Sequence, residues 1–286
     1  MRKILTVKEL ITLLLDYNMD ALVYTNANGV PTGISLPNVC YGRSGDGDGE
    51  TKKDCKEVIF DIQDEENECM TVASEQFADP YNGHTYVDLG LPSGTQWATM
   101  NVGANNETDT GLYFAWGETQ GYTASEIDTD KQFSWSDYKY GTSTDNLTKY
   151  NSTDGKTVLD LEDDAAHVNM GGDWHMPTKE QCLELFNTTY VTNAWVTDYN
   201  GSGINGRLFT SVSNGNTLFI PAVGFCGGGG VYSVGVYGSV WASALDSESV
   251  SGAWYFFFGS GGAGVDYDDR CGGLSVRGVV SLAEKI

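Results

Sequence analysis

The pattern of apolar residues in the first part of the chain predicts a small domain. Apolar residues recur at helical spacing over residues 7–17, and Thr6 with Glu9 three positions later is typical of a helix start. Short runs with strand-like alternation follow, at residues 21–25, 33–40 and 56–62. Asn28 and Gly29 are a turn signal between the first two runs. We therefore expect a small α/β domain over residues 1–65 and an acidic linker over residues 66–83.

Between residues 84 and 286 the pattern changes to many short strands. Two strands are expected around the turn at Pro92, within residues 85–99, and three more at residues 194–197, 206–211 and 217–222. We expect one core to receive Val87, Leu89, Trp97 and Ala98. A long polar stretch at residues 119–157 carries aromatic residues that would anchor it to the body, namely Phe133, Trp135, Tyr138 and Tyr140.

Helical signals in this second domain are few. Residues 159–168 can form one helix, and Thr178 with Gln181 is typical of the start of another just after Pro177. That second helix would face inward with Cys182, Leu183, Leu185 and Phe186. The predicted fold class is therefore α+β, with many short strands and about two helices.

The segment at residues 225–277 has an unusual composition. Between Phe225 and Gly273 it is built mainly from Gly, Ser, Tyr, Phe, Val, Ala and Asp, with no Lys, Thr, Asn, Pro, His, Gln, Ile or Met. Rigid aromatic residues among small adaptable ones are typical of binding surfaces such as antibody loops. The alternative is a Gly-rich run of short strands whose aromatic residues belong to the core.

The charge of the chain excludes some partners. Sixteen basic and thirty-nine acidic side chains give a net charge of −23, which argues against nucleic acid and against anionic membrane surfaces. No segment has the roughly twenty apolar residues needed for membrane insertion. The first residues begin like a secretory signal peptide, but Lys8, Glu9 and Asp16 interrupt the apolar run. We expect no such signal, and hence a cytoplasmic protein unless it is carried on a virion.

The spacing of the cysteines and histidines does not predict a metal or cofactor site. The six cysteines are scattered and the three histidines are not at ligand spacing, so we expect free thiols, no metal and no cofactor. The cysteines are Cys40, Cys55, Cys69, Cys182, Cys226 and Cys271.

Six sequence blocks fall in order over about 200 residues and carry a resemblance to a known family. They are DLGLPSGTQWA (88–98), YFAWGE (113–118), GGDWHMPT (171–178), LFIPAVG (218–224), WAS (241–243) and LSVR (274–277). Together they resemble the C-type lectin fold of the formylglycine-generating-enzyme branch, in the form of the variable proteins of diversity-generating retroelements. Such proteins are common in gut phages and Bacteroidales. The N-terminal segment resembles small N-terminal domains of phage-encoded proteins from gut bacteria.

The resemblance implies a non-enzymatic binding protein whose C-terminal region is hypervariable. In that family a reverse transcriptase copies a template and mutates its adenines, so that chosen codons vary on a fixed framework. The resemblance places on the framework Trp241, Phe256, Phe258, Val265, Arg270, Gly273, Ser275, Val276 and Arg277. It makes variable, and ligand-binding, Cys226, Gly228, Tyr232, Tyr237, Ser239, Val240, Ser249, Tyr255, Phe257, Asp266, Tyr267, Asp268, Asp269, Cys271 and Gly272. Exposed Tyr255, Phe257 and Tyr267 beside Asp266, Asp268 and Asp269 would then form an apolar and acidic surface.

Strand alternation supports part of this division. It places Trp254, Phe256 and Phe258 on one face of a strand and Tyr255 and Phe257 on the other.

Three functions stay open at this point. The first is recognition of a protein or glycan on a bacterial surface, with the N-terminal domain serving in self-association or in attachment to a virion. The second is an oxidase of the formylglycine-generating type, which would use Cys226 and Cys271 as its redox pair, although Arg270 is the one activating cation in sequence beside them. The third is a purely structural surface domain.

Overall fold

The computed structural model describes residues 22–25, 31–35, 57–58 and 80–281. The chain divides into two compact units, Met1–Val72 and Ala73–Ile286. In the first unit, three short strands form an antiparallel sheet in the order β1-β2-β3, with β1 at Leu22–Thr25, β2 at Pro31–Ser35 and β3 at Glu57–Val58. Each strand overlaps a predicted one. The predicted helix at 7–17, the turn at Asn28 and most of the linker lie outside the described residues.

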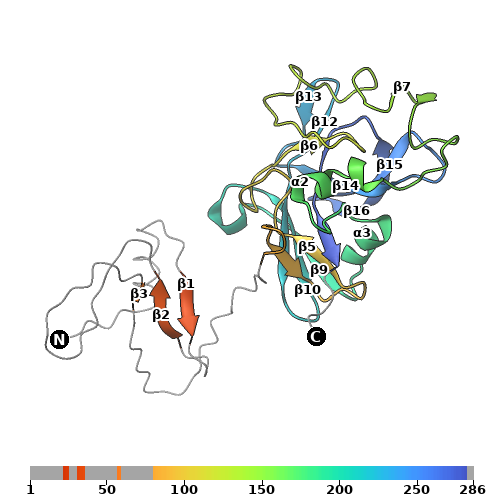
Figure 1. Ribbon diagram of the computed structural model, residues 1–286. Coiled ribbons are helices and arrows are strands. Elements are labelled where there is room, and N and C mark those ends of the chain that lie inside the picture. The colour runs from red at the N-terminus through yellow and green to blue at the C-terminus, as the bar shows by residue number, and fades with distance from the viewer. Residues whose placement is uncertain (1–21, 26–30, 36–56, 59–79, 282–286) are drawn as a thin grey trace, which may run out of the picture. The chain divides into compact units, whose positions relative to one another are not determined.

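The second unit is a mixed fold of short strands and two α-helices among its described residues (Figure 1). Its helices are α2 (Ala165–Met170) and α3 (Lys179–Leu185), with single 3₁₀ turns at Leu161–Asp163 and Tyr199–Gly201. Its strands are β4 (Tyr86–Asp88), β5 (Thr95–Ala98), β6 (Tyr113–Phe114), β7 (Gly141–Ser143), β8 (Asn146–Leu147), β9 (Val191–Val196), β10 (Gly206–Ser211), β11 (Thr217–Pro221), β12 (Phe225–Gly227), β13 (Gly230–Tyr232), β14 (Tyr237–Leu245), β15 (Gly252–Gly259), β16 (Gly262–Asp269), β17 (Leu274–Ser275) and β18 (Val279–Ser281). The α+β class is therefore confirmed. Neither of these helices is long and apolar enough to cross a membrane.

A five-stranded sheet forms the centre of the second unit. Its strand order is β16-β15-β14-β17-β6, and β16, at one edge, pairs with β15 over its full length. The pairing of β14 with β17 is parallel, and the other pairings are antiparallel. Four of its five strands, β14 to β17, therefore come from the segment at residues 225–277, and only β6 lies outside it.

The central sheet separates two hydrophobic clusters. Successive side chains of a strand point to opposite faces, so Val240 and Trp241 belong to different clusters. The first cluster contains Trp241, Trp116 and Tyr150, and the second contains Val240, Phe256 and Trp97. Because β14 lies inside the sheet and both of its faces are covered, the strand is buried along almost its whole length.

The smaller elements close the second cluster. Sheet β11-β10-β9 and sheet β18-β5-β4 contribute Phe209 and Trp97, and α3 packs against β14, β15 and β16. The capping box of Thr178 and Gln181 at the start of α3 is confirmed. Two predictions about the core are wrong. Leu183 on α3 is exposed, and Ala98 belongs to the first cluster rather than to that of Val87, Leu89 and Trp97.

The long polar stretch is anchored by its aromatic residues, as expected. Phe133, Tyr138 and Tyr140 are buried, and Trp135 packs edge-on against Tyr138 with ring centres 5.6 Å apart. The predicted helix at residues 159–168 is present only in part, as a 3₁₀ turn followed by the short α2.

Arg270 joins this stretch to the end of β16. Its fully buried guanidinium donates to the Tyr138 hydroxyl at 2.9 Å and to the carbonyl oxygens of Tyr150, Val250 and Lys149 at 2.8, 2.9 and 2.7 Å. Its own backbone carbonyl accepts from Trp116 at 2.9 Å. A planar guanidinium can serve all of these acceptors at once, whereas a lysine ammonium has only three donors on one atom.

We expect Arg270→Lys to lower the free energy of unfolding by about 2–4 kcal/mol, because buried carbonyl oxygens would lose their donors. Arg207→Lys is the matched control, since Arg207 is half-buried and, among the described residues, donates to Asn193 and to the Gly259 carbonyl. This control should lose about 1 kcal/mol or less. Urea unfolding of the two variants measures the difference, and equal losses would contradict the role given to Arg270.

Candidate binding face

Strand register brings several of the predicted variable residues to one face of the central sheet. Tyr255 on β15 lies opposite Trp241 on β14 and Asp266 on β16, and Phe257 lies opposite Ser239 and Gly264. Residues in direct opposition share a face, so Tyr237, Tyr255, Phe257, Asp266 and Asp268 all point the same way. The predicted alternation of Phe256 and Phe258 against Tyr255 and Phe257 is confirmed.

The aromatic side chains on this face touch one another. The rings of Tyr237 and Phe257 are nearly parallel, with centres 5.9 Å apart, and the Tyr255 ring lies 6.1 Å from that of Phe257. The hydroxyl oxygens of Tyr237 and Tyr255 are 3.4 Å apart. Phe225 and Tyr232, from β12 and β13, extend the group, because the Phe225 ring lies 5.6 Å from Tyr232 and 6.2 Å from Tyr237. We call these five residues the aromatic face.

The hairpin of β12 and β13 is held against β14 by a close backbone approach. Gly224 donates its N–H to the Tyr237 carbonyl at 2.7 Å and has a φ of +74°. A Cβ at this position would lie 1.9 Å from the Tyr232 carbonyl oxygen, so no larger residue fits. On its other side, β12 pairs with Gly273 through Cys226, whose N–H donates to the Gly273 carbonyl at 2.7 Å. The positions of Phe225 and Tyr232 are therefore fixed by backbone contacts.

The border of the aromatic face is acidic. Asp266 and Asp268 are exposed on the edge strand β16, on the same side as Tyr255. Asp269 is also exposed, but it lies on the other side of the sheet with Tyr267, so the expectation that it lies beside Tyr255 and Phe257 is wrong. Desolvation by surrounding protein atoms raises the pKa of Asp268, and the charges of Asp269 and Asp266 add to that shift. Burial raises the pKa of Tyr237 and of Tyr255, and the carboxylates of Asp268 and Asp266 contribute to both shifts. Charges on an edge strand also discourage pairing with other chains, which is a structural reason for them.

The fifteen predicted variable positions do not all reach the surface. Six are exposed, namely Gly228, Tyr232, Asp266, Tyr267, Asp268 and Asp269, and five are half-buried, namely Tyr237, Ser249, Tyr255, Phe257 and Gly272. The other four are buried, namely Cys226, Ser239, Val240 and Cys271. The expectation that these four face a partner is wrong.

Each buried position has a specific cause. Val240 lies opposite Phe256, on the same face of the sheet, and belongs to the second cluster. Ser239 donates its hydroxyl to the Gly224 carbonyl at 3.1 Å. Cys226 and Cys271 belong to the first cluster, where Cys226 is covered by the segment around Phe133. A change of side-chain size at any of these four positions would therefore disturb the packing of the protein interior.

Tyr267 was expected beside Tyr255 and Phe257, and this is also wrong. It lies opposite Trp254, on the other face of the sheet, with the two ring centres 5.9 Å apart. Trp254 is in turn covered by Lys179 of α3, whose Nζ lies 3.2 Å from the ring centre. Tyr267 is therefore exposed near α3, away from the aromatic face.

The predicted framework positions are nearly all buried. The buried ones are Trp241, Phe256, Phe258, Arg270, Gly273, Ser275, Val276 and Arg277, and Val265 is half-buried.

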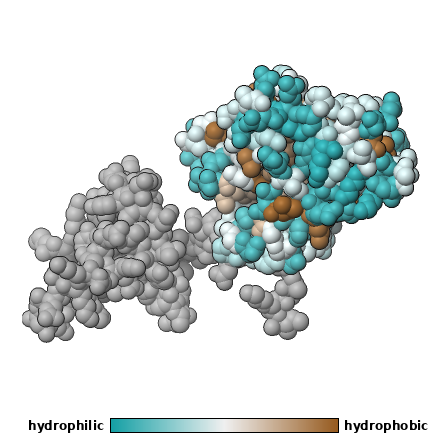
Figure 2. All heavy atoms as spheres, turned by 45° about the horizontal axis from the view of Figure 1, so that its top comes forward, coloured by the Kyte–Doolittle hydropathy of each residue, from teal (hydrophilic) through white to brown (hydrophobic). Residues whose placement is uncertain are grey.

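The structure adds exposed apolar residues that the sequence did not reveal. Val234 and Val236 are 58% and 63% exposed in the turn that joins β13 to β14, next to Tyr232. Their spacing is that of a strand, but Gly235 between them has a φ of +76°, which breaks the strand. In the view of Figure 2 most of the second unit is hydrophilic and its apolar residues form small separate patches.

The cysteines in the described residues are poorly suited to redox chemistry. Burial raises the pKa of Cys226 to about 12, and burial with the charges of neighbouring aspartates raises that of Cys271 to about 12. Cys182 is fully buried as well. A thiol with so high a pKa holds almost no thiolate at neutral pH, and the thiolate is the reactive form.

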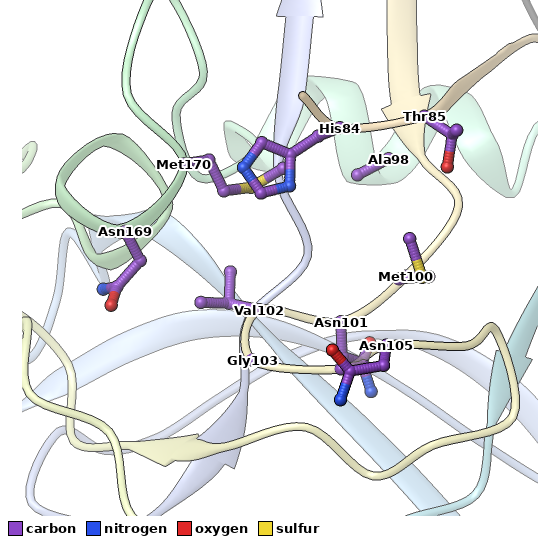
Figure 3. Close-up of a pocket in the computed structure, with 11 residues that line it drawn as sticks. His84, Thr85, Ala98, Met100, Asn101, Val102, Gly103, Asn105, Asn169 and Met170 are labelled. Carbon is purple, nitrogen blue, oxygen red and sulfur yellow. The ribbon is translucent and has the colours of Figure 1, made fainter. Parts of the chain in front are cut away.

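Two other features of the described residues lie apart from the aromatic face. Asp160, Glu162 and Asp163 are close enough to hold one cation, but the Lys149 ammonium already bridges all three, at 3.0, 3.1 and 2.5 Å. A hollow of about 230 Å³ lies between the end of α2 and the loop after β5 (Figure 3). Its polar lining includes His84, Asn101, Asn105 and Asn169, and no residue of segment 225–277 lines it.

Comparison of the chain with protein-family models, with curated proteins and with solved structures finds no match.

We expect Ser239→Tyr to destabilise the protein, because residue 239 is 1% exposed and lies directly under Gly224. Overpacking of this kind costs about 1–3 kcal/mol or more. Ser249→Tyr is the matched control, since Ser249 is half-buried in the turn between β14 and β15 and should change stability by about 0.5 kcal/mol. Thermal unfolding compares the two variants. If Ser239→Tyr were as stable as Ser249→Tyr, residue 239 would be a surface position after all.

Proposed function

We propose that the second unit is a non-enzymatic ligand-binding domain with a C-type lectin fold, of the kind diversified by retroelements. Its aromatic face recognises a surface target, and residues on that face are the ones exchanged. The observation that carries the proposal is the group of Tyr237, Tyr255 and Phe257. These three rings are half-exposed and in mutual contact, and they lie on a sheet whose opposite face is packed in the core.

Such a group suits recognition for a physical reason. Tyrosine and phenylalanine give large contact areas and lose little conformational entropy on binding, since each has only two side-chain torsions. Strands of a packed sheet hold them in place before the partner arrives, which lowers the entropic cost of binding. Exposed apolar groups with a polar border are also typical of interaction sites.

The separation of fixed and exchangeable residues supports the same function. Phe256 and Phe258 are buried, whereas their neighbours Tyr255 and Phe257 reach solvent. Exchange of the outward residues would leave the second cluster unchanged, because adjacent residues of a strand point to opposite faces. A partner on a bacterial surface, either protein or glycan, agrees with the resemblance to phage-encoded proteins. The N-terminal unit would then attach the domain to a virion or to a second copy.

The oxidase alternative is disfavoured by the state of the two cysteines. Both Cys226 and Cys271 are buried, and the pKa of each is raised to about 12. The guanidinium of Arg270, the cation nearest to Cys271 in sequence, is committed to four oxygen acceptors.

A pair of displayed libraries tests the proposal. One library randomises six positions at the candidate site, namely Tyr232, Tyr237, Tyr255, Phe257, Asp266 and Asp268. The control library randomises six exposed apolar positions elsewhere, namely Val158, Leu161, Val168, Leu183, Ile204 and Val212. Both are displayed as the full chain and selected against an unrelated protein such as streptavidin.

We expect folded members in both libraries but specific binders only from the first. Binders arising equally from the control library, or a first library in which nearly every member is unfolded, would contradict the proposal. Protease resistance on the display particle reports folding independently of binding.

A further inference from the structure

The carboxylates beside the aromatic face lack a positive partner. Among the described residues, no Lys, Arg or His nitrogen forms an ion pair with Asp266, Asp268 or Asp269. Other acidic side chains in the same unit do have one, such as Glu118 with Lys131 at 2.8 Å. The three aspartates lie within four residues of an edge strand, and burial raises the pKa of Asp268, with a further contribution from the charges of Asp269 and Asp266.

Two of these carboxylates, those of Asp266 and Asp268, lie on the same face of the sheet as the Tyr255 ring. Asp266 is directly opposite Tyr255 in the sheet. Asp268 is opposite Ala253, which lies two residues before Tyr255 on the same face. A positive charge placed between them would be attracted by the carboxylates and by the ring faces together. No neutral ligand would relieve the repulsion between the carboxylates.

Elsewhere in this unit, tyrosine rings and an aspartate surround lysine ammonium groups. The Lys149 ammonium lies 5.0 Å from the ring centre of Tyr150 and is paired with Asp163 at 2.5 Å. Lys139 likewise lies 4.6 Å from the centre of the Tyr140 ring and 3.1 Å from Asp163. There, tyrosines and an aspartate jointly hold lysines of the chain itself. The aromatic face combines the same types of side chain, with Tyr255, Asp266 and Asp268 on one side of the sheet.

From these observations we propose that the partner of this copy of the protein is a cationic protein segment, which places an arginine or lysine side chain against Tyr255 and Phe257 and between the carboxylates of Asp266 and Asp268. This inference rests on the proposed function and specifies its ligand. The net charge of −23 also favours a cationic partner, because it attracts cations over long range and repels polyanions such as nucleic acids or acidic glycans.

Selection from a random peptide library displayed on phage tests the inference, with the full chain immobilised as the bait. We expect the enriched peptides to carry arginine or lysine and a net positive charge. A parallel selection on the Tyr255→Ala/Phe257→Ala variant identifies peptides that bind elsewhere on the chain.

Affinity measurements on one enriched peptide then locate the charge. Asp266→Asn/Asp268→Asn should weaken binding about tenfold or more, since two ion pairs are lost. Asp145→Asn/Glu180→Gln removes the same net charge from two exposed sites elsewhere and should change affinity less than about twofold. Replacement of the peptide arginine by citrulline, which has the same shape without the charge, should weaken binding to the wild-type chain and not to the double asparagine variant.

The outcomes separate the two proposals. If no peptide is enriched on the wild-type chain beyond the Tyr255→Ala/Phe257→Ala variant, the proposed function itself fails. If peptides are enriched but are neutral or acidic, or if both charge-removal variants weaken binding equally, only the cationic partner is overturned. Thermal unfolding of each variant confirms that a lost affinity is not a lost fold.

Discussion

The candidate binding face depends most on the hydrogen bonds that the buried guanidinium of Arg270 donates. It stands directly after β16 and bonds backbone carbonyls from the turn before β15 and from the long polar stretch. Its burial is tolerable because neutral oxygens with correct geometry take up its donors, and the rings of Trp116 and Tyr138 lie 5.5 and 5.3 Å from it. The end of β16 is thereby tied to segments more than a hundred residues away in sequence.

This attachment explains how a Gly-rich segment can present a defined surface. Glycine and serine provide little packing of their own, so the strands must be held by their neighbours. The second cluster holds one face of β15 through Phe256 and Phe258, and the close approach of Gly224 holds the β12–β13 hairpin against β14. Tyr255 and Phe257 are then displayed from a packed sheet, and the second cluster on its opposite face does not include them, although Tyr255 also packs edge-on against Trp241 of the first cluster.

The sequence predicted the elements of the second unit better than the exposure of individual residues. The strands at residues 206–211 and 217–222 and the start of α3 at Thr178 were predicted because alternation and capping are local signals. Burial of Val240 and Ser239 is not predictable in this way. A strand inside a sheet is covered on both faces, so the alternation of its side chains does not distinguish buried from exposed positions. Tyr267 was misplaced for a related reason, since its face follows from its register against Trp254.

The central claim is that exchange is confined to outward residues on a fixed framework, and the DNA around the gene tests it most directly. The account predicts a nearby partial copy of the codons for residues 225–277, beside a reverse transcriptase gene. Its mismatches should be confined to adenines and should fall on codons such as those of Tyr255, Phe257 and Asp266. The codons of Trp241 and Arg270 should match in both copies. Absence of such a copy, or mismatches spread evenly over framework codons, would contradict the account.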